Sequence, residues 1–172
     1  MASTNKTTNL RLNQWEGTDP ILRTDFNQDN SKIDQAVTAR ALVRLTGKTL
    51  SAAATAITVD LLDYDLTQYE GLELTLAPIT SAAGTTTLTV GTASPVSLAS
   101  MAADGSRGLV IHLHFLPGGV GGWWFAPGLT AGSTGGFLAA GVTAYELEEV
   151  TLSSPSAPYQ SGTAWTLYGL KK

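Results

Sequence analysis

The sequence predicts a mainly β protein: an antiparallel β-sandwich, jelly-roll-like domain preceded by an N-terminal extended arm and one α-helix. Two observations predict this fold class. Beyond residue 50, apolar and polar residues alternate in several short stretches, which is the period of half-buried strands. Before residue 50, apolar residues recur at helical spacing. We expect the arm to span residues 1–45, with its helix at about 24–40, and the sandwich to span residues 46–172.

The helix of the arm is predicted from a capping signal followed by a narrow apolar stripe. Asp19-Pro20 favours an extended or turned backbone, after which Thr24 or Asp25 can cap the first helical turn. The apolar positions that follow fall on one helical face: Phe26, Ile33 and Val37. Because an isolated helix of this length is marginal in water, we expect the stripe to pack on the β domain or on other copies of the chain.

The strands are predicted from period-two alternation, which is clearest in residues 57–61, 72–76, 88–90, 109–115 and 165–168. The alternation slips at Glu148-Glu149, which predicts a β-bulge there. The glycine-rich stretches 117–122 and 127–136 are predicted as loops. Seven to nine short strands with Gly, Ser and Pro turns favour a sandwich or jelly roll. A parallel α/β fold is disfavoured, because no helical pattern separates the strands.

Composition excludes several classes of function. The chain has no cysteine, which removes disulfides, thiol catalysis and the common structural zinc sites. Residues 49–170 hold nine acidic residues and one basic residue, Arg107, so the β region cannot form the basic groove that binds nucleic acid. The first residues carry no apolar segment, and no run is long enough for a membrane helix. We expect neither a signal peptide nor membrane insertion.

The two histidines offer a weak candidate for metal binding. His112 and His114 stand two residues apart on a predicted strand, so they project from the same face. Two imidazoles from one chain make a poor site, whereas three chains around a threefold axis would offer six nitrogens to a transition metal. The alternative is a pair of solvent-facing or interface histidines, and our prediction for one chain is no metal.

Adjacent aromatic residues form the other candidate site. Neighbouring residues on a strand face opposite sides, so one of Trp123 and Trp124 can enter the core only if the other points outward or into a partner chain. The structural interpretation is a core residue plus a subunit-interface residue. The functional interpretation is a stacking platform for a sugar ring.

Enzyme motifs are absent from the sequence. It contains no Gly-x-Ser-x-Gly elbow, no His-Glu-x-x-His zinc helix, no Walker loop and no cysteine nucleophile. Acids such as Glu70 and Glu73 are interpreted as solvated residues at a strand end. We predict a non-enzymatic chain without a cofactor.

Residues 7–37 contain three short motifs in a fixed order. An Asn-Leu-Arg-Leu segment and a Gly-Thr-Asp turn precede "DFNQDNSKID". This order resembles the N-terminal segment of bacteriophage and prophage tail-appendage proteins, which are tail-fibre or baseplate components. The pattern departs where Asp29-Asn30 stands in place of a single Asn, and the resemblance does not extend into the β region. The matching residues are Asn9, Leu10, Leu12, Trp15, Gly17, Thr18, Asp19, Asp25, Phe26, Asn27, Lys32, Ile33 and Asp34.

The resemblance implies a virion structural protein, assembled in the host cytoplasm, in a homotrimeric fibre or baseplate appendage. The arm would attach to other virion proteins, and the β domain would contact the host surface. Trimerisation would bury the apolar stripe as coiled-coil a and d residues are buried. Two alternatives remain: a capsid-decorating or head-fibre protein, and a carbohydrate-binding module for host glycans that uses Trp123 or Trp124. The residues assigned to attachment and oligomerisation are Trp15, Asp19, Phe26, Ile33 and Val37.

Overall fold

A computed structural model of the chain describes residues 5–20, 22–38, 41–80, 82–91, 96–101, 108–127 and 133–172. The chain divides into two compact units, Met1–Ala41 and Leu42–Lys172. Across the described residues every strand pairing is antiparallel, and there is one α-helix. The predicted mainly β fold with a single helix is therefore confirmed. The sequence placed the boundary between residues 45 and 46, whereas the units meet between Ala41 and Leu42.

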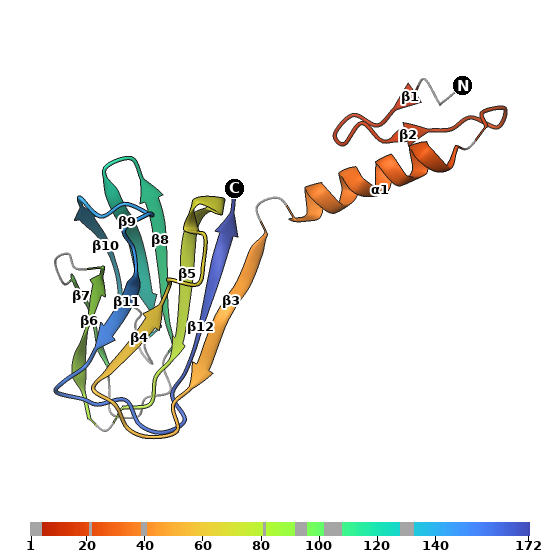
Figure 1. Cartoon of the computed structure of the whole chain (residues 1–172). Coiled ribbons are helices and arrows are strands. Elements are labelled where there is room, and N and C mark those ends of the chain that lie inside the picture. The colour runs from red at the N-terminus through yellow and green to blue at the C-terminus, as the bar shows by residue number, and fades with distance from the viewer. Residues whose placement is uncertain are drawn as a thin grey trace. The chain divides into compact units, whose positions relative to one another are not determined.

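The arm contains a short hairpin and a helix (Figure 1). Strand β1 (Asn5–Lys6) pairs with β2 (Asn13–Gln14). Helix α1 (Arg23–Thr38) follows, and it begins one residue before the predicted start at residue 24. The predicted end at residue 40 lies outside the described residues.

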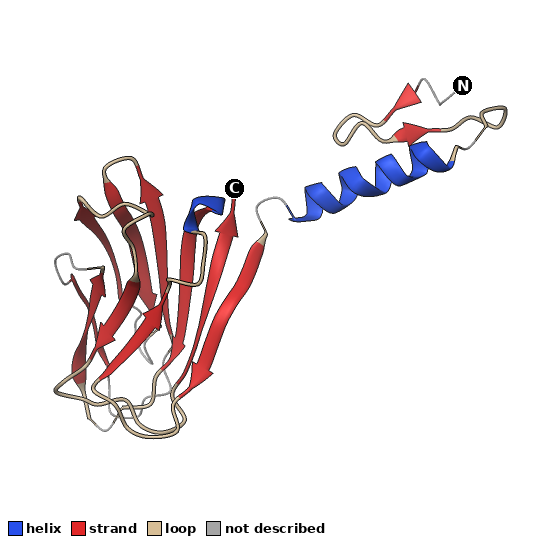
Figure 2. Ribbon diagram, viewed as in Figure 1, coloured by secondary structure: helices blue, strands red, loops and turns tan. Residues whose placement is uncertain are grey.

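The second unit is a sandwich of two antiparallel sheets, drawn as two layers of strands in Figures 1 and 2. The larger sheet has the strand order β10 (Ser133–Ala140), β9 (Gly119–Ala126), β8 (Leu109–Leu116), β5 (Tyr69–Ala77), β12 (Ala164–Lys171), β3 (Leu42–Thr49). The smaller sheet has the order β4 (Ala56–Asp60), β11 (Glu149–Ser153), β6 (Gly84–Val90), β7 (Val96–Met101). A 3-10 turn, η1 (Leu66–Gln68), precedes β5.

The inner faces of the two sheets share one apolar core. Alternate residues of the predicted strands are buried there, as the period-two pattern requires. Burial of each such aliphatic side chain contributes about 1.5–3 kcal/mol, so the sandwich holds its own source of stability. Core residues include Ile57, Val59, Leu72, Leu74, Leu88, Val90, Leu109, Ile111, Leu113, Val150, Leu152, Trp165 and Leu167.

Two glycine-rich stretches that the sequence predicts as loops contain strand residues instead. Residues 119–122 belong to β9 and residues 133–136 belong to β10, which raises the described strands of the sandwich to ten. A Cβ added at Gly122 would lie 1.9 Å from the His112 carbonyl oxygen. A Cβ added at Gly135 would lie 2.6 Å from Trp124 Nε1. These glycines permit close packing within the sheet, and the loop prediction is wrong for these residues.

The bulge predicted at Glu148-Glu149 is also wrong. Glu149 is the first residue of β11, and it pairs in regular register with Asp60. The phase of the alternation changes because a turn precedes the strand. In this turn the Glu146 amide donates to the Thr143 carbonyl at 3.1 Å. The apparent slip in the sequence therefore marks the end of a turn.

Candidate functional site

In the arm, a buried carboxylate joins the hairpin to the helix. Asp29 of α1 accepts hydrogen bonds from the backbone amide of Asn13 at 2.8 Å and from Asn13 Nδ2 at 2.9 Å. Lys32, one turn later, donates to the Arg11 carbonyl at 2.9 Å and lies 3.5 Å from Asp29 Oδ1. Burial alone raises the pKa of Asp29, but the bonds from Asn13 and the charge of Lys32 lower this pKa below its ordinary value. The polar residues Asp29 and Lys32 thus join the helix to the hairpin.

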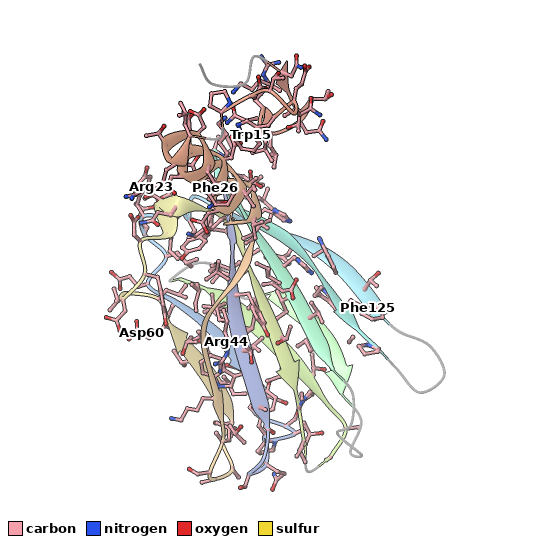
Figure 3. The ribbon with its side chains drawn as sticks, turned by 90° about the vertical axis from the view of Figure 1, so that its right-hand side faces the viewer. Trp15, Arg23, Phe26, Arg44, Asp60 and Phe125 are labelled. Carbon is pink, nitrogen blue, oxygen red and sulfur yellow. The ribbon has the colours of Figure 1, made fainter. Side chains whose placement is uncertain are left out.

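The apolar residues of the same helix are left uncovered within the arm. Phe26, Ile33 and Val37 are 52%, 40% and 71% exposed, and Figure 3 labels Phe26 among the side chains of the helix. With Asn30, which is also exposed, they follow the four-three-four spacing of coiled-coil d, a, d and a positions. We call this set the helix stripe. Among the described residues it is a mainly apolar surface that the arm covers only in part.

The other two residues assigned to attachment have local roles in the arm. Asp19 closes a turn: its carboxylate accepts from the Glu16 amide at 3.0 Å, and its own amide donates to the Glu16 carbonyl at 2.9 Å. Trp15 is half-buried and is labelled in Figure 3. Its Nε1 and the Asp25 Oδ2 atom are buried, and neither has a hydrogen-bond partner among the residues that the structure describes.

In the β domain, the outer face of the larger sheet carries a row of aromatic and charged or ionisable side chains, which we call the sheet row. Each member is the register partner of the next on the neighbouring strand. Since register partners share a face of the sheet, the row crosses five strands. Its members, from β9 to β3, are Trp123, His112, Glu73, Tyr168 and Arg44, the last of which is labelled in Figure 3.

The adjacent tryptophans point to opposite sides of the sheet, as the sequence predicts. Trp124 is 8% exposed and belongs to the core, whereas Trp123 is 45% exposed on the outer face. The Trp123 ring stacks on His112, with ring centroids 3.8 Å apart and an interplanar angle of 21°. His112 Nε2 lies in turn 3.2 Å from Glu73 Oε2. The exposed indole is therefore supported on one face by an imidazole that a carboxylate orients.

The charge state of His112 follows from its surroundings. Partial burial lowers the pKa of His112, the charge of Glu73 opposes this shift, and nearby His114 adds to it. The net effect places the pKa of His112 below its ordinary value of 6.5, so the stacked imidazole is neutral at neutral pH. Its contact with Glu73 then joins a neutral ring to a carboxylate, which is weaker than an ion pair.

His112 and His114 both lie on the outer face of β8, as their spacing predicts. In the described part of the chain, no group of three or more metal-ligating side chains gathers in one place. A metal site shared by three chains was only a weak candidate, and nothing in a single chain tests it. His114 instead lines a shallow pocket of about 100 Å³ beside Glu73 and Gly71, with Leu42 and Leu170 across from it.

Tyr168 and Arg44 were not singled out in the sequence. Glu73 was interpreted as a solvated residue at a strand end, and this is wrong, because it lies within β5 and contacts His112 with its side chain only 19% exposed. All three come from strands that are far apart along the chain, and only the antiparallel register brings them into line with Trp123. One local signal exists: Glu73 interrupts the leucines of β5 and therefore had to face outward.

No helix in the described residues is both long and apolar enough to span a membrane. The chain matches no protein-family model, and searches of the curated proteins and of the solved structures found no significant match.

Proposed function

We propose that the chain is a non-enzymatic structural protein of a bacteriophage or prophage virion. In this proposal it forms a homotrimeric tail-fibre or baseplate appendage, which attaches through its arm and displays the β domain toward the host surface. The single observation that carries the proposal is the exposed helix stripe. The resemblance of residues 7–37 to attachment segments supports the same assignment.

The helix stripe has the chemistry of a self-association surface. Within the arm, hydrogen bonds of Asp29 and Lys32 join the helix to the hairpin. Phe26 and Val37 remain more than half exposed, and an isolated helix of this length is marginal in water. In a parallel bundle, Phe26 and Ile33 would occupy core layers on either side of Asn30. A polar a-position residue such as Asn30 fixes the register and number of chains at some expense in stability.

The acidic surface of the sandwich supports a displayed role for the second unit. The second unit, Leu42–Lys172, carries nine acids and five bases, and this net negative charge disfavours contact between copies of the unit while the arms associate. Assembly and display are then divided between the two units. A capsid-decorating or head-fibre protein would use the same division at another place on the particle, so imaging of labelled virions distinguishes the two locations.

The test of the proposed function is the solution mass of the purified chain at high micromolar concentration. We expect the full chain to be a trimer and a deletion lacking residues 1–40 to be a monomer. Val37→Ser should weaken the trimer, because it places a hydroxyl in a core layer of the bundle. Leu62→Ser is the matched control, since Leu62 of the β domain is 69% exposed against 71% for Val37. A full chain that stays monomeric would contradict the proposal.

A further inference from the structure

Trp123 has one covered ring face and one free ring face. His112 of β8 covers the first. The second is directed toward β10, where the register partner of Trp123 is Gly136. A Cβ added at Gly136 would meet only the Gly122 carbonyl oxygen, at 3.6 Å. The indole therefore stands beside an open slot whose floor is the backbone of Gly136.

The slot has an uncharged rim and an open side. Thr134 and Leu138, two residues before and after Gly136, project from the same face of β10 and are exposed, Leu138 by 62%. Phe125 of β9 is 39% exposed on this face and is labelled in Figure 3. Because β10 is the edge strand of the sheet (Figure 1), a ligand can enter from the side and continue beyond it.

We propose that the slot between Trp123 and Gly136 is a saccharide-binding site that stacks one hexopyranose ring of a neutral glycan. The face of an indole ring carries partial negative charge, and the C–H groups on one face of a pyranose carry partial positive charge. Because Gly136 has no side chain, a sugar ring can stand upright on the sheet with its face against the indole ring. A neutral sugar is favoured because none of the described residues that border the slot carries a charge.

The stack with His112 prepares the site before a ligand arrives. An exposed tryptophan normally loses side-chain freedom when it binds, and this loss weakens binding. Here His112 and Glu73 already hold the indole upright, with contacts of 3.8 Å between ring centroids and 3.2 Å from nitrogen to oxygen. Three strand spacings across the sheet, about 14 Å, and two residues further along β5, the pocket over Gly71 is bordered by Glu73 and His114, and these can hydrogen-bond a further unit of the same glycan.

A second copy of this chain fits the slot less well than a sugar does. A stable protein interface buries about 800 Å² on each side, and its core is poor in charged residues. The free surface here is one indole face above one glycine, and the row behind it contains Glu73 and Arg44. The slot is also separate from the helix stripe, so this inference goes beyond the proposed function and does not depend on it.

The test is a titration of the full chain with each of three neutral disaccharides: cellobiose, lactose and maltose. Binding is monitored through the NMR signal of the Trp123 indole N–H. Glycerol at equal concentration controls for bulk solvent. We expect at least one sugar to shift this signal saturably with a millimolar or tighter dissociation constant. Trp123→Ala should weaken binding about tenfold or more, with binding then followed by the sugar's own resonances.

Gly136→Leu is the decisive variant, because its side chain fills the slot while the contact at 3.6 Å shows that the backbone tolerates a Cβ. It should lose binding to the same extent and keep the unfolding midpoint of the parent. Gly118→Leu is the matched control, since a Cβ at this turn glycine has no neighbour within 4 Å, and it should bind normally.

The proposal is overturned if none of the three sugars shifts the Trp123 signal, or if Gly136→Leu binds as tightly as the parent. It is also overturned if Gly136→Leu lowers the solution mass of the chain, because the slot would then be a protein interface. Loss of sugar binding with an unchanged solution mass would leave the proposed trimeric assembly intact.

Discussion

The arm and the β domain differ in how far their apolar side chains are buried. In the β domain, Leu74, Ile111 and Leu167 are completely buried between two sheets. In the arm, Phe26 and Val37 are more than half exposed, and the helix is joined to the hairpin by hydrogen bonds of Asp29 and Lys32. The difference indicates that the β domain is stabilised by its own core, whereas under the proposed function the arm gains its stability from association of the helix stripe.

The largest effect that would sharpen this comparison comes from the core of the sandwich. Leu74→Ala should lower the free energy of unfolding of the β domain by about 2–5 kcal/mol, because it removes buried methyl groups and leaves a cavity. Leu62→Ala, at an exposed position of the same domain, should change it by less than about 0.5 kcal/mol. Urea unfolding followed by tryptophan fluorescence measures both. Equal effects would mean that the apparent core does not stabilise this unit.

A smaller, local effect is expected in the arm. Asp29→Ala removes the acceptor of both Asn13 hydrogen bonds and leaves two donors unsatisfied. The Asn13 amide should then exchange its hydrogen faster, as should the amides of α1, while those of β5 and β12 keep their protection. Hydrogen exchange read by NMR is the measurement, with Gln28→Ala on the exposed surface of α1 as the control. Unchanged protection at Asn13 would show that this carboxylate does not join hairpin and helix.

The sequence predicts the inward residues of this fold better than its outward ones. Alternation places Leu72 and Leu113 in the core because burial demands a strict period of two. The alternation pattern fails at Gly122 in β9 and Gly135 in β10. Glycine has no side chain, so it does not indicate which face of the strand is buried.

Candidate sites were predictable only where one stretch of chain contained them. Trp123 and His112 could each be singled out from local sequence. Their stacking, and the lining up of Glu73 and Arg44 with them, depend on strand register between distant segments, which no local pattern encodes. The apolar members of the helix stripe, Phe26, Ile33 and Val37, were predicted because one helix carries them all, whereas Asn30 was not assigned to the stripe. The exposure of the stripe follows from Asp29 and Lys32, which bind the hairpin to another part of the helix surface.

The smallest expected effect is a pH dependence of the β domain. Because the pKa of His112 is lowered by folding, the unfolded chain binds a proton at this residue more readily than the folded chain does. The contribution of His112 to stability is therefore complete above its ordinary pKa of 6.5 and is lost as the pH falls below that value. Of the two neighbouring ionisable residues, Glu73 raises the pKa of His112 and His114 lowers it.

His112→Gln should accordingly flatten the dependence of the unfolding midpoint on pH between about pH 8 and pH 5. Thermal unfolding across this range compares the variant with the parent. Glu73→Gln should steepen the dependence, since it removes the group that favours the protonated ring. A steeper dependence in His112→Gln would contradict the sign derived from the burial of this residue.

The most direct test of the central claim, that the helix stripe is the assembly surface, uses the absence of cysteine from the chain. Val37→Cys introduces one thiol on the stripe, and Leu62→Cys introduces one at a matched exposure on the β domain, 71% against 69%. Under mild oxidation the stripe variant should form intermolecular disulfides rapidly and stop when two of every three chains are joined, as a three-chain bundle requires. Oxidation no faster than that of Leu62→Cys would contradict the claim.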